Sequence, residues 1–229
     1  MTTGMVDALG DGKSNVELLE TMGNDLTVVN AARVSFNKES QTMCEADEKL
    51  IRYLAKHGHI SPFFHPQVRL RLKMPIFVAR EWFRHTVGFA RNEVSRRYVD
   101  YEAETYNPLH LRARDPKLKQ GSKEEDVLEN DRAVEFIRKS HDDAIANYES
   151  LMAMNVAPEV ARMALPQSMY TEFIETASLY GYARLCKLRL DPHAQKEIQL
   201  YAEAVDSLLK ERFPVSWAAL MGQTVTQSL

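Results

Sequence analysis

Hydrophobic and polar positions alternate most clearly over residues 67–74. Apolar residues occupy every second position, and polar or basic residues lie between them: Gln67, Val68, Arg69, Leu70, Arg71, Leu72, Lys73 and Met74. A period of two is typical of a strand that packs one face and exposes the other. The pattern therefore predicts a strand at Gln67–Met74 with one buried and one basic face. Residues Ser168–Ala177, rich in threonine and aromatic side chains, predict a second strand.

Apolar residues spaced three and four apart predict helices along most of the remaining chain. Over Glu45–His57 this spacing is followed by Gly58, a residue type that commonly ends a helix. The other expected helices are one capped by Asp25, one from Pro75 to about Gly88, one over Lys123–Met154, a short one over Pro158–Ala164, one capped by Asp191 before Pro192, and one from Pro214.

The order of these elements indicates an α+β domain that is rich in helices and has few strands. No internal repeat, low-complexity block or linker interrupts the chain, so we expect a single domain over residues 1–229. Residues 1–15 are polar, rich in glycine and without periodicity, and they predict a loose start to this domain.

Composition narrows the class of protein. The chain has 229 residues, 45% hydrophobic and 27% charged, with a formal net charge of −3, which is ordinary for a globular protein. No apolar run approaches the ~20 residues that span a bilayer, so we expect no membrane partner. The acidic balance and the lack of a basic helical stripe argue against a nucleic-acid partner. The start shows no signal peptide, and Cys44 and Cys186 are too few for a disulfide framework, so we expect a cytoplasmic protein.

The densest cluster of polar chemistry lies at residues 84–98. Its members include four arginines, a histidine, a glutamate and a serine: Arg84, His85, Arg91, Glu93, Ser95, Arg96 and Arg97. Because arginine matches phosphate bidentately and Gly88 ends the helical pattern, we interpret the cluster mostly as a loop that binds an anion such as a nucleotide phosphate. The alternative is a solvated basic loop paired with acids such as Asp100 and Glu102.

Two smaller clusters have simpler alternatives. His57, His59 and His65 could bind a metal, but no further ligand follows at a readable spacing, and a polar loop lining a ligand pocket is the favoured interpretation. The favoured interpretation of the third cluster, taken alone, is a set of cations gathered at a helix C-terminus: Arg184, Lys187, Arg189 and His193. We predict no metal site.

Common catalytic motifs are missing. The chain has no glycine-rich phosphate loop and no nucleophile elbow, so arginines and loop amides would have to hold a nucleotide. Neither Cys44 nor Cys186 has a neighbouring histidine in the sequence to act as a base, and we expect neither to be catalytic.

The same residues resemble a known family. Arg84-His85 followed by Asn92-Glu93-Val94-Ser95-Arg96-Arg97-Tyr98 is similar to the signature of flavin-dependent thymidylate synthases, which is Arg-His-Arg, seven or eight residues, then Ser. Further stretches resemble that family in the same order: Met22–Phe36, Tyr53–Phe63, Met74–His85, Val160–Pro166 and Lys187–Ala202. Together the resemblance covers about residues 16–215.

The resemblance implies a fold and an activity. Members of the family methylate dUMP to dTMP, with methylenetetrahydrofolate as the carbon donor and NADPH to reduce a bound FAD. It also implies a small antiparallel sheet flanked by helices, assembled as a homotetramer whose active sites are shared between subunits. The ligands expected on this basis are dUMP, FAD, NADPH and folate.

The resemblance implies the site residues as well. It assigns dUMP binding to Glu81, Arg84, Glu93, Ser95, Arg96, Arg97, Arg162 and Arg189, and gives Arg189 the catalytic role of stabilising negative charge on the uracil. It assigns contacts with FAD or folate to Ser35, His59, Ser61, Arg84, His85, Thr86, Val87, Arg91, Arg184 and His193.

The chain departs from the family pattern at several of these places. Thr86 stands at the third signature position instead of arginine, and Arg91 is the candidate to replace that charge. Phe64, Ser178, Tyr180 and Arg184 differ from the expected glutamate, asparagine, arginine and asparagine. Two alternatives therefore stay open: an enzyme that adds a different one-carbon group to a pyrimidine deoxynucleotide, such as hydroxymethyl, and a nucleotide-binding homologue without catalysis.

Overall fold

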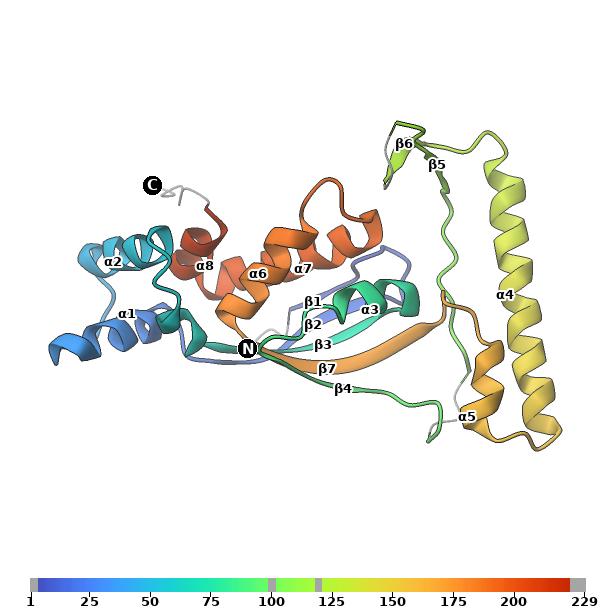
Figure 1. The fold of residues 1–229 in the computed structure, drawn as a ribbon, viewed down its shortest axis with the longest axis horizontal. Coiled ribbons are helices and arrows are strands. Elements are labelled where there is room, and N and C mark those ends of the chain that lie inside the picture. Colours follow the sequence, from blue (N-terminus) through green and yellow to red (C-terminus); the bar gives the residue numbers. More distant parts are fainter. Residues whose placement is uncertain (1–3, 99–101, 118–120, 223–229) are drawn as a thin grey trace. The chain divides into compact units, whose positions relative to one another are not determined.

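The structure is a computed structural model that describes residues 4–98, 102–117 and 121–222 (Figure 1). Its strands are β1 (Met5–Val6), β2 (Asn15–Met22), β3 (Gln67–Pro75), β4 (Phe89–Glu93), β5 (Arg112–Arg114), β6 (Ser122–Asp126) and β7 (Tyr170–Ser178). Its α-helices are α1 (Asp25–Arg33), α2 (Glu45–Lys56), α3 (Ile76–Trp82), α4 (Asn130–Ala153), α5 (Pro158–Ala161), α6 (Leu179–Arg189), α7 (Lys196–Arg212) and α8 (Pro214–Met221). Three short 3₁₀ turns are η1 (Val34–Phe36), η2 (Ser61–Phe64) and η3 (Arg162–Ala164).

The main sheet is small and antiparallel. It has five strands in the order β1-β2-β3-β7-β4, and β1 lies antiparallel to β2 with Met5 opposite Glu17. With its helices it confirms the predicted α+β class. The chain divides into two compact units: unit 1 holds the residues up to Leu72, His85–Asn92 and those from Ile174 on, and unit 2 holds Lys73–Arg84 and Glu93–Phe173. A single domain over 1–229 stays a prediction.

Strand β3 follows its sequence pattern. Its four apolar residues, Val68, Leu70, Leu72 and Met74, have no exposed surface. The opposite face is basic as predicted, and in unit 1 it is matched by acids on β2: Arg69 pairs with Glu20 at 2.8 Å and Arg71 with Glu17 at 3.5 Å. Each such exposed cross-strand pair contributes little stability, so the strand is held mainly by its buried face.

The helices of unit 1 form its core. Helix α2 packs on α8, and α6 packs on both α7 and α8. The large side chains of Tyr182, Tyr201 and Trp217 are fully buried there. Asn24, not Asp25, caps α1, because its side chain accepts from the Thr27 N–H.

Asp25 instead caps a different helix. Its carboxylate accepts the Val215 N–H at 3.0 Å and the Ser216 N–H at 2.9 Å, in the first turn of α8. These amides have no partner within the helix, so a carboxylate at this end satisfies them and favours the helix dipole. The contact fastens α1 to the C-terminal part of unit 1.

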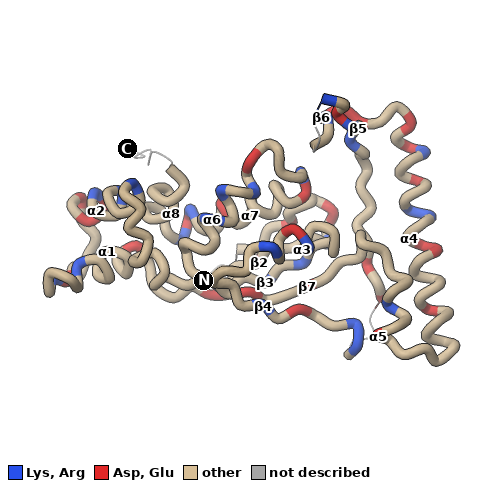
Figure 2. The backbone as a smooth tube through the Cα atoms, in the orientation of Figure 1, with Lys and Arg blue, Asp and Glu red and all other residues tan. Residues whose placement is uncertain are grey.

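Unit 2 contains the long helix α4, which packs against α5 and η3 (Figure 1). The predicted helix over Lys123–Met154 begins too early, since Ser122–Asp126 is strand β6 paired with β5. These five residues are all exposed and offer no apolar face to a helix. Helix α4 begins at Asn130, whose side chain bonds the backbone of Leu109 and Leu111. Acidic and basic residues are mixed in its first half, and its second half has charged residues of acidic type alone (Figure 2).

Three other boundaries differ from the predictions. Pro75 ends β3 and caps α3, and that helix stops at Trp82, short of Gly88. Helix α7 begins at Lys196, because Asp191 closes a turn by accepting the His193 N–H at 2.8 Å.

The start of the described chain is ordered rather than loose. Met5–Val6 pairs with β2, and the Asp7 carboxylate holds the following turn by accepting the Gly10 and Gly12 N–H groups. The remaining predictions for α2, β3, β7 and α8 agree with the structure. Within the described residues, no helix combines the length and the apolar character that a membrane span requires.

Candidate active site

Unit 2 contains an open pocket of about 310 Å³ beside the ends of β4 and β7. It is lined by Ile76, Glu93, Val94, Arg96, Arg162, Met163, Leu165, Pro166, Gln167, Met169, Tyr170 and Thr171. Apolar walls with a few convergent polar groups are typical of a small-molecule site. Three residues expected in the nucleotide site line this one pocket: Glu93 and Arg96, which are close in the sequence, and Arg162, which is far from both.

The two arginines of the pocket are held differently. Arg96 is buried, with 7% of its surface exposed, and donates through Nη2 to the Glu102 carbonyl at 3.3 Å. Arg162 lies on η3 and donates through Nε to the Glu159 carbonyl at 3.3 Å. No carboxylate among the described residues pairs with Arg162. Its charge is therefore available to an anionic ligand.

Ser95 and Arg97 form the turn that follows β4. The Tyr98 N–H donates to the Ser95 carbonyl at 3.0 Å, and the Ser95 hydroxyl accepts the Arg97 N–H at 3.3 Å. Arg97 is exposed, lies over the Tyr98 ring and pairs with Glu159 at 3.5 Å. Neither Ser95 nor Arg97 lines the pocket. Strand β4 also lies inside the segment that the sequence predicted mostly as loop, which corrects that prediction.

Glu81 and Arg84 lie at the end of α3, also in unit 2. The backbone N–H of Arg84 donates to the Glu81 carbonyl at 3.3 Å. Glu81 is half-buried and Arg84 is exposed. Neither residue lines the pocket, so the structure does not bring them together with Glu93 and Arg162 within unit 2.

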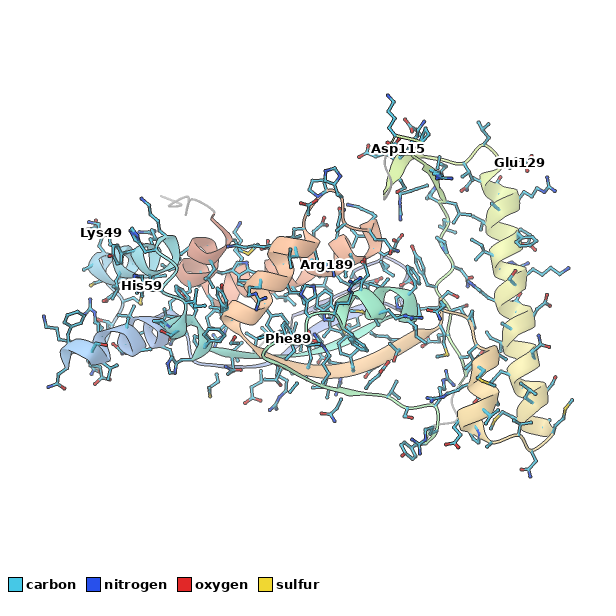
Figure 3. All side chains as sticks on the ribbon, in the orientation of Figure 1. Lys49, His59, Phe89, Asp115, Glu129 and Arg189 are labelled. Atoms are coloured by element: carbon cyan, nitrogen blue, oxygen red, sulfur yellow. The ribbon has the colours of Figure 1, made fainter. Side chains whose placement is uncertain are left out.

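Unit 1 brings Arg189 and His85 together. Arg189, labelled in Figure 3, is the last residue of α6. Its Nε–H donates to His85 Nε2 at 2.9 Å. Because a guanidinium keeps its protons in proteins, Nε2 of His85 must be the acceptor, and the imidazole is neutral with its proton on Nδ1. The bond joins two predicted site residues that are 104 positions apart.

Arg91 is engaged inside unit 1. Its Nε–H donates to Glu175 Oε2 at 2.5 Å, and the side chains are 14% and 0% exposed. The guanidinium lies 4.7 Å from the centre of the Phe89 ring. Burial and then the Glu175 carboxylate raise the pKa of Tyr182 well above its usual range. The charge of Arg91 thus compensates a buried carboxylate.

The other residues expected to face FAD or folate are mostly exposed on unit 1: Ser35, His59, Ser61, Thr86, Val87, Arg184 and His193. His59 stacks on Tyr53 with 6.0 Å between ring centres and 23° between planes. Within the described part of the chain, Arg184 has no ion-pair partner.

Three of the departures from the family pattern have a structural role. Phe64 and Tyr180 pack against each other with 5.2 Å between ring centres. Ser178 is buried and caps α6 by accepting the Gly181 N–H at 3.1 Å.

Sequence reasoning missed two groups of residues. Thr171 lines the pocket and donates to Glu93, but a single threonine in a strand carries no signal. His141 accepts from the Ser168 hydroxyl at 2.6 Å and donates to Asn107 at 2.7 Å. Burial lowers the pKa of His141, and the neighbouring Asp142 opposes that shift.

Neither cysteine is placed for nucleophilic chemistry. Cys186 is fully buried, and burial raises the pKa of its thiol well above the usual range. Cys44 is exposed, and its Sγ donates to Asp47 at 3.1 Å. Among the described residues, no three histidine, cysteine, aspartate or glutamate side chains come together as metal ligands.

Comparison with known proteins places these features in a family. The family described as "thymidylate synthase complementing protein" matches residues 17–215. A flavin-dependent thymidylate synthase of Thermus thermophilus is 42% identical over 207 residues, covering 90% of this chain and 75% of that protein. One of Thermosipho africanus is 40% identical over 210 residues, covering 91% of both.

A solved structure is also similar. The UMP/dUMP methylase PolB of Streptomyces cacaoi, bound with 5-Br dUMP, has a TM-score of 0.81 and 29% sequence identity, over 93% of this chain and 96% of that one. The same protein bound with 5-Br UMP has a TM-score of 0.77. The match spans most of the chain, and so this protein belongs to the thymidylate synthase complementing family of flavin-dependent thymidylate synthases.

Proposed function

We propose that this chain is a flavin-dependent thymidylate synthase that methylates dUMP to dTMP. The observation that carries the proposal is the pocket of unit 2, where Arg96 and Arg162 face the same space as Glu93. Two guanidinium groups suit a phosphate, and a carboxylate suits a hydroxyl or N–H donor of the nucleoside. Relatives with the enzyme's name and a similar structure bound with a dUMP analogue support this assignment.

The nucleotide site we propose extends beyond the pocket. Arg96 and Arg162 bind the phosphate, Ser95 and Arg97 shape the adjacent turn, and Glu93 contacts the nucleoside. Glu81 and Arg84 complete the set that the family resemblance assigns to dUMP. Arg189 holds the uracil and stabilises the negative charge that develops on its carbonyl oxygens during methyl transfer.

The residues of unit 1 fit FAD in their chemistry. Arg184 is exposed and has no ion-pair partner among the residues that the structure describes, which suits a diphosphate. Exposed aromatic rings suit planar ring systems. We propose that Ser35, His59, Ser61, His85, Thr86, Val87, Arg184 and His193, with Arg84, hold FAD or folate. Arg91 belongs to the buried pair with Glu175, and we do not assign it a flavin contact. Bound FAD, reduced by NADPH, would supply the hydride that completes the new methyl group.

The remaining partners follow from the family. We propose methylenetetrahydrofolate as the carbon donor. We also propose that the chain forms a homotetramer with active sites shared between subunits. Each chain would be a single domain, and the protein would be cytoplasmic. A chain of 229 residues is short for a site that must hold FAD, folate and a nucleotide, and neighbouring subunits would supply the missing surfaces. Light scattering during size-exclusion chromatography measures the assembly directly, and a monomer would contradict it.

A spectrum of the purified protein tests ligand binding. After loading with FAD, the protein should keep a flavin absorption band through gel filtration, and dUMP should shift that band. A protein that binds dUMP by calorimetry but neither keeps flavin nor turns over dUMP would instead be a nucleotide-binding homologue without catalysis. A protein that binds neither ligand would overturn the proposed function.

A further inference from the structure

Thr171 and Glu93 face each other across two neighbouring strands. Strands β7 and β4 are adjacent, and the Val94 N–H donates to the Glu172 carbonyl at 2.9 Å. Side chains alternate along a strand, so the residues one place away from this bonded pair share the opposite face. There the Thr171 hydroxyl donates to Glu93 Oε1 at 2.6 Å.

The side chains of Thr171 and Glu93 differ in conformational freedom. Thr171 is buried, with 4% of its surface exposed, and a β-branched side chain is stiff about its first torsion. Glu93 is exposed in the pocket and has a long, flexible side chain. The rigid hydroxyl therefore fixes the flexible carboxylate, and Oε1 is occupied while Oε2 remains to accept from a ligand.

This contact matters because the same pocket contains two cations. A mobile Glu93 could turn onto Arg96 or Arg162 and neutralise the charge that a phosphate needs. Within the described residues Glu93 has no ion-pair partner, although both guanidinium groups line its pocket. We propose that Thr171 is a positioning residue that keeps Glu93 off the arginines and aims its free oxygen at the nucleoside of the bound nucleotide.

The inference rests on the proposed function for the identity of the ligand but not for the geometry. Preorganisation lowers the cost of ordering a side chain on binding, so loss of the hydroxyl should weaken nucleotide binding even though Thr171 need not touch the ligand. Thr171 must also act through Glu93, so the effects of substitutions at the two residues on dUMP binding should not add.

Calorimetry with dUMP on the full-length protein tests this. Thr171→Val keeps the shape and loses the hydroxyl. It should raise the Kd for dUMP up to about 10-fold, which is the cost of ordering one flexible side chain on binding. Thr171→Ser keeps the hydroxyl and should stay within about twofold. In a Glu93→Ala background, which removes the acceptor of the hydroxyl, Thr171→Val should add less than about twofold. Thr176→Val, on the same strand, is the matched control and should change nothing.

Each other outcome counts against the inference. An equal loss in Thr171→Val with and without Glu93→Ala, or an equal loss in Thr171→Ser, would make Thr171 a general packing residue and overturn it. A crystal structure of ligand-free Thr171→Val separates this from the proposed function. The carboxylate of Glu93 should lie against Arg96 or Arg162 there, and an unmoved carboxylate would overturn the inference even if dUMP is the true ligand.

Discussion

Arg189 donates its Nε–H to Nε2 of His85 at 2.9 Å. The bond leaves the two terminal nitrogens of the guanidinium outside this contact and fixes the direction in which they point. It also requires a neutral imidazole, because a protonated histidine has no acceptor. The histidine of the Arg84-His85 signature thus orients the arginine to which we assign the chemistry.

The first prediction concerns this pair. Replacement of His85 by alanine should lower kcat about 10- to 100-fold with a smaller change in the KM for dUMP, because a misplaced arginine loses transition-state contacts first. His85→Gln offers an amide oxygen near the position of Nε2 and should recover most of the loss. Steady-state kinetics with FAD in excess measures kcat and KM for the two variants. A rise in KM alone for His85→Ala would contradict the orienting role.

Alanine substitutions of Arg162 and Arg97 should change the KM for dUMP to different extents, although both residues are exposed arginines near the pocket. Arg162 lines the pocket and has no carboxylate partner among the described residues, whereas Arg97 lies outside it and pairs with Glu159. Arg162→Ala should raise the KM for dUMP about 10- to 100-fold with kcat nearly unchanged, since a phosphate contact contributes uniform binding. Arg97→Ala should raise it less than about fivefold. Equal effects of the two substitutions would contradict our outline of the site.

The buried ion pair of Arg91 and Glu175 should stabilise the fold rather than hold flavin. Removal of one partner leaves a buried charge without compensation, so Arg91→Met should lower the free energy of unfolding by about 3–5 kcal/mol. The double variant with Arg91→Met and Glu175→Leu should lose less free energy of unfolding than the sum of the losses in the two single variants. Urea denaturation measures this. A stable Arg91→Met with a weakened FAD Kd would show that the arginine contacts the flavin after all.

His141 should make stability depend on pH. Its pKa in the folded protein is lowered by burial, so between that value and its ordinary one the unfolded chain binds more protons. Stability should therefore be full above the ordinary pKa of histidine and fall as the pH drops through the lowered one. Asp142 opposes the shift and limits its size. Between pH 8 and pH 5, the urea midpoint should decline less in His141→Asn than in the wild type. Parallel declines in the two proteins would show that His141 is not a source of the pH dependence of stability.

Sequence patterns predicted the elements whose burial follows a regular period. Strand β3 and helix α2 have one clear apolar face, and Gly58 marks the end of α2 in a left-handed conformation, with φ of +69°. Strand β4 could not be found in this way. It is short, lies at the edge of the sheet, and its residues Phe89–Glu93 do not alternate. Strand β6 is wholly exposed, so no apolar period separates it from the helix that follows.

The site was predicted as a set of charges but not as a set of contacts. The arginines at 84–97 and Arg162 were found because guanidinium groups at motif positions are visible in the sequence. Their partners were not, because Arg91 bonds Glu175 and Arg189 bonds His85 across separations of 84 and 104 residues. Thr171 shows the same limit, since only strand pairing reveals that it faces Glu93.

The mass of the product formed from dUMP tests the central claim most directly. The purified protein should be incubated with dUMP, FAD, NADPH and methylenetetrahydrofolate, and the nucleotide analysed by mass spectrometry. We predict a gain of about 14 Da, the exchange of a hydrogen for a methyl group, that disappears when FAD or NADPH is withheld. A gain of about 30 Da would mean hydroxymethylation, and an unchanged mass with flavin bound would mean no methyl transfer. Either result would contradict the account.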